Sequence, residues 1–117
     1  LTIMQLNTNK SDISTHDFLH GKGGNAGIVA IQEPHIDFLG NARPPPHHIT
    51  IYPINHKQQY KETPTRSILL VNSKISTGSW TQLRINSPDV TAIQMTTEIG
   101  TIRIFNIYND CGNDEAI

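Results

Sequence analysis

Three polar side chains end or follow strand-like apolar runs at widely separated places in the sequence. Asn7 ends the first run of the chain, Glu33 follows the run 27–32, and Tyr108 lies near the end of the run 101–109. If the three runs are strands whose C-terminal ends meet at one edge, an amide, a carboxylate and a phenol come together there. A carboxylate is an oxygen ligand suited to Mg²⁺, and the amide and phenol can orient phosphate oxygens. This set of groups suits phosphoester hydrolysis, although a glutamate after an apolar strand is more often simply solvated.

The runs that hold these residues have the composition and spacing of β-strands. The run 27–32 is almost continuously apolar, which indicates a strand buried on both faces. Ile99 and Gly100 are expected to form the two-residue turn of an antiparallel hairpin. The three prolines at 44–46 indicate a surface rim, and the polar segment 53–65 is expected to be mobile. The predicted strands cover residues 1–7, 27–32, 49–52, 67–72, 80–85, 90–97 and 101–108.

One helix is predicted over residues 12–20, after the capping side chains at 9–12. Its short apolar face is formed by Ile13, Phe18 and Leu19. The glycine-rich stretch 21–27 contains a dinucleotide-binding pattern, but it precedes a strand, whereas that pattern requires a helix at this place. This stretch is therefore predicted to be a loop.

Together these elements predict an α/β layered fold, with one mixed or mainly antiparallel sheet of about six or seven strands and the helix 12–20 on one face. One helix cannot cover both faces of such a sheet. Residues 109–117 also read as a loop followed by only the first turn of a helix. We therefore expect the chain to be part of a larger domain, marginally stable alone and able to self-associate through an uncovered sheet face. The predicted core consists of Ile3, Met4, Leu6, Leu19, Ile28, Val29, Ile31, Leu69, Val71, Ile93, Ile102 and Ile104.

The composition limits the classes of protein that remain. With 36% hydrophobic residues and a formal net charge of -1, the chain of 117 residues is outside the disordered class. No apolar run approaches the roughly 20 residues that a membrane span needs, and any nucleic-acid role must rest on a local site because the overall charge is not basic. The single cysteine, Cys111, cannot form an internal disulfide or a cysteine zinc site, which fits a reducing compartment. It is expected to be a half-buried thiol.

Four segments together resemble the endonuclease/exonuclease/phosphatase superfamily. They are Leu6-Asn7-Thr8-Asn9, Ile31-Gln32-Glu33-Pro34, Arg66-Ser67-Ile68-Leu69-Leu70-Val71 and Asn106-Ile107-Tyr108-Asn109. Within that superfamily, Gln-Glu-Pro-His and Asn-Ile-Tyr are most similar to the apurinic-type endonuclease domains of non-LTR retrotransposons, especially fungal ones. The resemblance covers residues 1–117 as the N-terminal half of a single family domain, and it implies half of a layered β-sandwich with flanking helices.

The resemblance also implies roles for the three polar residues. Asn7 becomes the active-site asparagine, Glu33 the Mg²⁺-binding glutamate and Tyr108 the tyrosine that contacts the scissile phosphate of DNA. The implied location is intracellular, and nuclear for an expressed retroelement. The family's later Gly-Asp-Phe-Asn and Ser-Asp-His segments do not occur in residues 1–117, and no histidine lies where the family places its base. Because general acid–base catalysis alone supplies about 10²- to 10⁴-fold, we expect no useful nuclease activity from these residues alone.

Two other interpretations stay open. Another branch of the superfamily would act on phosphoinositides or sphingomyelin, although Tyr108 and the Glu-Pro-His sequence argue mildly against it. A non-enzymatic binding module or a degenerate remnant would use an exposed sheet face to bind a partner. His47 and His48 point to opposite sides of an extended chain and are expected to be solvated instead of binding zinc. His35 is expected near the substrate cleft because it is close to Glu33.

Overall fold

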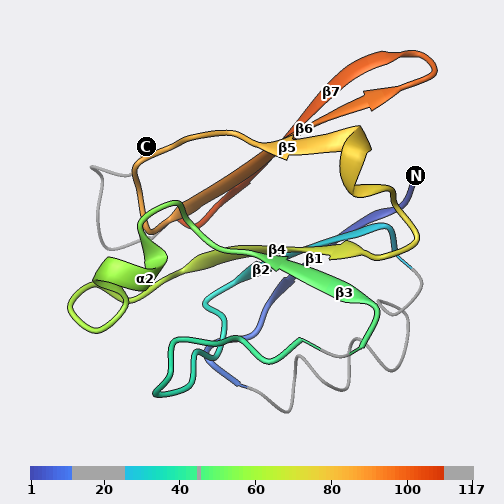
Figure 1. Cartoon of the computed structure of the whole chain (residues 1–117). Helices are drawn as coiled ribbons and strands as arrows, with labels where there is room; N and C mark the ends of the chain where they lie inside the picture. Colours follow the sequence, from blue (N-terminus) through green and yellow to red (C-terminus); the bar gives the residue numbers. More distant parts are fainter. Residues whose placement is uncertain (12–25, 45, 110–117) are drawn as a thin grey trace.

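The computed structural model describes residues 1–11, 26–44 and 46–109, and within them seven strands form two sheets (Figure 1). The strands are β1 Ile3–Asn7, β2 Ile28–Gln32, β3 His48–Ile51, β4 Ser67–Asn72, β5 Trp80–Gln82, β6 Val90–Thr97 and β7 Gly100–Ile107. The strand count and the layered class are as predicted, and all seven strands lie close to their predicted positions, although β5 ends three residues earlier than the predicted strand 80–85. The strands are divided between two sheets, however, where the sequence had suggested one. The predicted helix 12–20, Leu19, Cys111 and the helical turn near the C-terminus lie outside the described residues.

The first sheet brings the ends of β1 and β2 to one edge. Its strand order is β1-β2-β4-β3, with β1 and β2 parallel and the other pairs antiparallel. In the parallel pair Asn7 lies opposite Gln32, so that Asn7 and Glu33 leave the sheet at the same edge. Gln32 in turn lies opposite Ser67, the first residue of β4.

The second sheet is an antiparallel meander of β5, β6 and β7 that packs over the first sheet (Figure 1). β6 and β7 form the predicted hairpin, but its turn residues are Glu98 and Ile99, one position earlier than expected. Gly100 has a φ of +129° and is already paired with Thr97 as the first residue of β7. A glycine is suited to this position because L residues rarely adopt such a φ.

Most of the buried apolar side chains lie on β2, β4 and β6, in two layers. Between the sheets lie Ile28, Ala30, Ile51, Leu69, Val71, Ile93 and Met95. On the other face of the first sheet lie Ala26, Val29, Ile31, Ala42, Ile68 and Leu70. β2 and β4 are therefore covered on both faces, as the continuous apolar run of β2 had indicated. Each fully buried Ile or Leu contributes about 1.5–3 kcal/mol to the stability of the fold.

The predicted core is confirmed in its centre and wrong at one edge. Six of its members are fully buried, and these are Ile28, Val29, Ile31, Leu69, Val71 and Ile93. Met4, Leu6, Ile102 and Ile104 are partly buried. Ile3 is exposed, because β1 is an edge strand whose alternate residues face outward.

The polar segment 53–65, expected to be mobile, contains the helical turn α2 His56–Gln59. His56 is only 4% exposed and its ring stacks on Tyr52 and Tyr60, with centroids 4.3 and 5.4 Å away. Its Nε2 donates to the carbonyl of Gly40 at 2.6 Å, and its Nδ1 lies 2.5 Å from the hydroxyl of Thr65. The segment is thus fixed by one buried histidine that joins it to the loop after β2.

Candidate functional site

The two sheets meet at a hydrogen bond between two of the three predicted site residues. The Tyr108 Oη, just beyond β7, donates to the Glu33 Oε1 at 2.6 Å, although the residues are 75 positions apart in the sequence. A bond from a hydroxyl to a carboxylate of this length is short and charge-assisted. The structure therefore brings Glu33 and Tyr108 together, as the argument from the strand ends predicted.

Glu33 has an unusual backbone that its neighbours hold in place. Its φ is +51°, a conformation that costs an L residue about 1–2 kcal/mol. Its N–H donates to the Arg66 carbonyl at 2.9 Å, and its carbonyl accepts from the Thr8 Oγ1 and the Lys10 N–H, both at 2.7 Å. Asn9 and Lys10 also have positive φ. Three of the five non-glycine residues with positive φ in the described chain therefore cluster here, and such clusters are typical of functional sites.

The strain at Glu33 leads to a prediction that separates backbone from side chain. Glu33→Gly and Glu33→Ala both remove the carboxylate, but only glycine relieves the left-handed backbone. We expect Glu33→Gly to be more stable than Glu33→Ala by about 1 kcal/mol in urea unfolding followed by the fluorescence of Trp80. At the neighbouring Gln32, in regular strand, the order should reverse and alanine should be the more stable. If glycine and alanine ranked in the same order of stability at positions 32 and 33, the proposed strain at Glu33 would be contradicted.

Asn7, the third predicted site residue, lies at the same edge of the sheet, but its side chain makes a different kind of contact. Its Oδ1 accepts from the backbone N–H of Asn9 at 2.9 Å, so its side chain stabilises the turn after β1. It does not line the pocket beside Glu33 and Tyr108. That turn nevertheless carries Thr8 and Lys10 to the Glu33 backbone.

A small pocket of about 140 Å³ lies beside the Glu33–Tyr108 bond and is lined by Lys10, Glu33, Arg66 and Tyr108. The Arg66 guanidinium lies 5.4 Å from the centroid of the Tyr108 ring and 4.0 Å from the Asp89 Oδ1. Two basic side chains thus share the pocket with one carboxylate and one phenol. Neither Lys10 nor Arg66 was predicted from the sequence to take part in the site. The only signal for Arg66 was its place in one of the four resembling segments.

Asn106 fixes the position of Tyr108 relative to Glu33. Its side chain is 2% exposed, and its Nδ2 donates to the carbonyls of Ile31 at 2.9 Å and Ile68 at 2.8 Å. Its Oδ1 accepts from the Gln32 Nε2 at 3.1 Å. One amide from β7 therefore joins β2 and β4 across the interface of the sheets. It lies two residues before Tyr108 in the sequence, and its partner Gln32 directly precedes Glu33.

The backbone of Asn106 is held as well. Its carbonyl accepts from the Ser67 Oγ at 2.7 Å, and that hydroxyl is 2.6 Å from the Thr91 Oγ1. Ser67 and Thr91 are fully buried, so this polar network has no contact with solvent. Satisfied networks of this kind specify one arrangement of the groups around them.

Glu33 fits Mg²⁺ as a single oxygen-ligand residue. In the ranges that the structure describes, no three His, Cys, Asp or Glu side chains are grouped to hold a metal ion. Mg²⁺ is often bound through only one or two carboxylates and retains several waters, so one carboxylate with flanking phosphate is an acceptable partial set. His47 is exposed, as expected, but His48 is partly buried: its Nδ1 lies 3.3 Å from the Pro46 carbonyl, and its Nε2 is buried without a hydrogen-bond partner among the described residues. His35 lines a second pocket that shares Lys10 with the first.

None of the helices in the described ranges has the length and apolar character needed to cross a bilayer. Comparison with models of protein families, with curated proteins and with solved structures finds no match for this chain. The function of the chain is therefore inferred from the geometry of the site.

Proposed function

We propose that the chain forms the Glu33 side of a Mg²⁺-dependent phosphodiesterase site of the endonuclease/exonuclease/phosphatase type, acting on DNA as in the endonuclease domains of retroelements. The proposal is supported above all by the 2.6 Å bond between Tyr108 and a backbone-strained Glu33 in a pocket that also contains Lys10 and Arg66. Two cations attract a phosphodiester, and the carboxylate attracts the metal that accompanies it. An intracellular, nuclear location belongs to the same proposal.

In this site each group has a distinct task. A bound Mg²⁺ supplies Lewis-acid polarisation of the phosphate. Glu33 would hold the cation through its carboxylate, and the Tyr108 hydroxyl keeps that carboxylate oriented. Lys10 and Arg66 bring the phosphate oxygens into the pocket, and the planar guanidinium of Arg66 is suited to binding phosphate through two hydrogen bonds. A residue able to activate water is not among these groups, so we propose that hydrolysis needs the segments with the family's later aspartates and histidine.

The test is a titration of the chain with Mn²⁺, which substitutes for Mg²⁺ and broadens nearby NMR signals. We expect selective broadening of the signals of Glu33 and Tyr108. Glu33→Ala should lower the apparent affinity for Mn²⁺ about tenfold or more. Glu62→Ala removes an exposed carboxylate elsewhere and should leave the broadening unchanged. In parallel, the chain should nick supercoiled plasmid no faster than Glu33→Ala does. Broadening that persists in Glu33→Ala would overturn the proposed metal site, and nicking specific to Glu33 would show that the later segments are dispensable.

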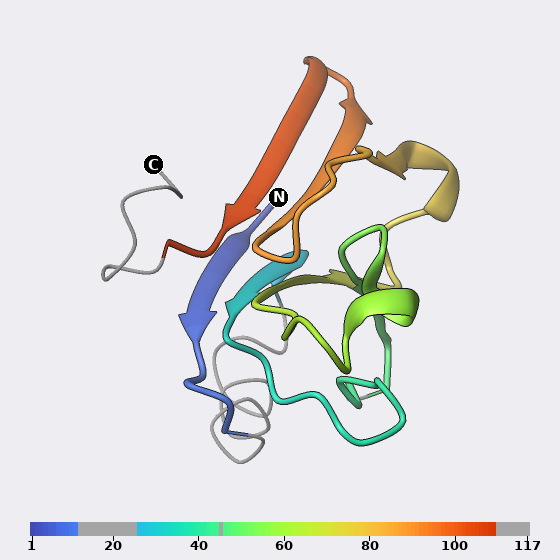
Figure 2. The same ribbon diagram turned by 90° about the vertical axis from the view of Figure 1, so that its left-hand side faces the viewer.

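A second candidate function is self-association as a binding module. A groove of about 350 Å³ runs between the edge strands β1 and β7, which lie side by side in Figure 2, and the exposed Ile3, Phe105 and Ile107 line it. Exposed apolar patches of this kind support protein association. Sedimentation equilibrium should then show a dimer that Phe105→Ser weakens. A monomer at all concentrations would exclude this function.

A further inference from the structure

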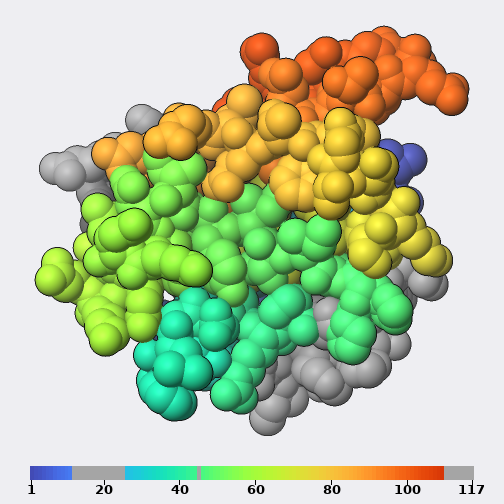
Figure 3. Space-filling model, viewed as in Figure 1, coloured from blue at the N-terminus to red at the C-terminus, as the bar shows by residue number. Residues whose placement is uncertain are grey.

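The loop 34–44, which follows Glu33, exposes two large apolar side chains at its tip. Phe38 is 80% and Leu39 62% exposed. Single exposed apolar residues are common, but an adjacent aromatic and aliphatic pair on a projecting loop leaves considerable apolar area in water. In Figure 3 this loop, coloured teal, forms part of the lower edge of the molecule.

The tip is held rigidly by its own residues. The Asp37 Oδ1 accepts from the backbone N–H groups of Leu39 and Asn41, each at 2.9 Å, and its Oδ2 accepts from the Arg43 Nε at 2.8 Å. The bond from Asn41, followed by those from Arg43 and Leu39, lowers the pKa of Asp37, so the turn keeps its ionised carboxylate at neutral pH. Gly40, with a φ of +85°, completes the turn.

Three side chains fasten the loop to the body of the protein: His56 of α2, Tyr60 directly after α2, and Tyr52 directly after β3. The Tyr60 Oη donates to the Phe38 carbonyl at 3.2 Å, and the His56 Nε2 donates to the Gly40 carbonyl at 2.6 Å. The Tyr52 Oη accepts from the Ala42 N–H at 3.0 Å. The two apolar side chains are thus presented by a preformed loop, which loses little conformational entropy on binding.

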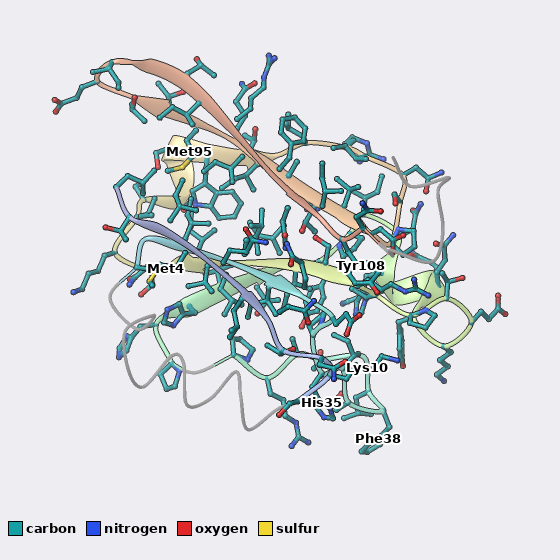
Figure 4. The ribbon with its side chains drawn as sticks, turned by 180° about the vertical axis from the view of Figure 1, so that it is seen from behind. Met4, Lys10, His35, Phe38, Met95 and Tyr108 are labelled. Atoms are coloured by element: carbon teal, nitrogen blue, oxygen red, sulfur yellow. The ribbon has the colours of Figure 1, made fainter. Side chains whose placement is uncertain are left out.

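The loop lies next to the phosphodiester site. A pocket of about 270 Å³ is lined by residues that include Lys10, Tyr60 and the loop residues His35 and Asp37. Lys10 also lines the first pocket, beside Glu33. Figure 4 shows Tyr108, Lys10, His35 and Phe38 in succession along one side of the molecule. A polymer with a phosphate at Tyr108 would therefore pass Lys10 and reach Phe38.

We propose that Phe38 and Leu39 form a wedge that inserts between neighbouring bases of the DNA whose phosphodiester lies at the Glu33–Tyr108 site. The inference rests on the proposed function. Proteins that deform DNA insert phenylalanine and leucine into base steps in this way, and aromatic rings stack on bases of any sequence. DNA is favoured as the occupant because the wedge continues a path of cationic and aromatic side chains that begins at a phosphoester pocket. The wedge holds the duplex in a bent form and brings the backbone to Glu33.

The test uses a DNA duplex with one 2-aminopurine, whose fluorescence rises when it is unstacked, and the full chain in EDTA so that no metal contributes. We expect the wild-type chain to increase the fluorescence. The double variant Phe38→Ala, Leu39→Ala should abolish this increase and weaken binding about tenfold by anisotropy. Both side chains are exposed, so the variant should keep the circular dichroism of the wild type. Ile99→Ala is the matched control, because Ile99 is 91% exposed on the β6–β7 turn at the opposite end of the molecule (Figure 1).

Each possible result decides the proposal. An unchanged fluorescence response in the double variant, a loss equal to that of Ile99→Ala, or no response to the wild-type chain would overturn the wedge. So would a defect of the double variant confined to binding of lipid vesicles or to self-association. Glu33→Ala should retain the fluorescence response while losing the Mn²⁺ site. Failure of the wedge and failure of the metal site are therefore observed separately.

Discussion

Replacing Asn106 with leucine is expected to lower the free energy of unfolding by about 3 kcal/mol, because it removes one buried amide and leaves several buried groups without their partners. The carbonyls of Ile31 and Ile68 and the side-chain amide of Gln32 would each lose a hydrogen bond. Leucine has nearly the shape of asparagine, so the loss measures the polar contacts more than the packing. Urea unfolding monitored through Trp80, the only tryptophan of the chain, gives the value.

Two further variants test the cause. Asn106→Asp keeps the shape but directs a carboxylate oxygen at two carbonyl oxygens, and it should destabilise the protein at least as much as leucine does. Asn109→Leu alters an exposed asparagine three positions later and should change stability by less than about 0.5 kcal/mol. A loss below about 1 kcal/mol for Asn106→Leu would mean that the amide does not fix the two sheets. The NMR signals of Glu33 and Tyr108 should shift in the destabilised variants, because these residues follow the segments that Asn106 joins.

The strands could be predicted from the sequence because alternation and apolar runs are local patterns. The run 28–32 and the hairpin 90–107 needed only the preferences of neighbouring residues. The division into two sheets could not be predicted, since it depends on which strands pair over long distances. Ile3 shows the same limit. Its exposure depends on the position of β1 at the edge of the sheet, and that position cannot be predicted from the sequence of β1.

The polar part of the structure was the least predictable. Asn106 and His56 are buried and make several hydrogen bonds. In the sequence, Asn106 is one polar residue within a strand-like run and His56 is one polar residue of the segment 53–65, so neither is recognisable as buried. Glu33 and Tyr108 could be paired in advance because both follow strands, and the ends of strands gather at an edge. Lys10 could not be assigned to the site in advance, because it reaches the site through a turn in which Asn9 and Lys10 have positive φ. Such a turn is usually recognised by a glycine, and this one contains none.

Replacing His56 with alanine is expected to cost about 2 kcal/mol of stability and to release the loop 34–44 from the body of the protein. The ring is stacked between two tyrosines, an interaction of about 0.5–1.5 kcal/mol for each aromatic pair, and it bonds to Gly40 and Thr65 through its two nitrogens. Because the carbonyl of Gly40 can only accept, Nε2 carries a hydrogen, and Nδ1 forms the second hydrogen bond with the Thr65 hydroxyl. Alanine would leave a cavity and two buried polar groups without these bonds.

The release of the loop distinguishes this effect from general destabilisation. Amide hydrogen exchange in His56→Ala should increase at Leu39 and Asn41 more than in the strands β2 and β4, because only the loop depends directly on the lost bond to Gly40. His47→Ala removes an exposed histidine and should change neither the stability nor the exchange. Uniform acceleration across the strands would show that His56 supports only the core. Faster exchange in the loop alone would show that α2, a helical turn not predicted from the sequence, holds the loop that presents Phe38 and Leu39.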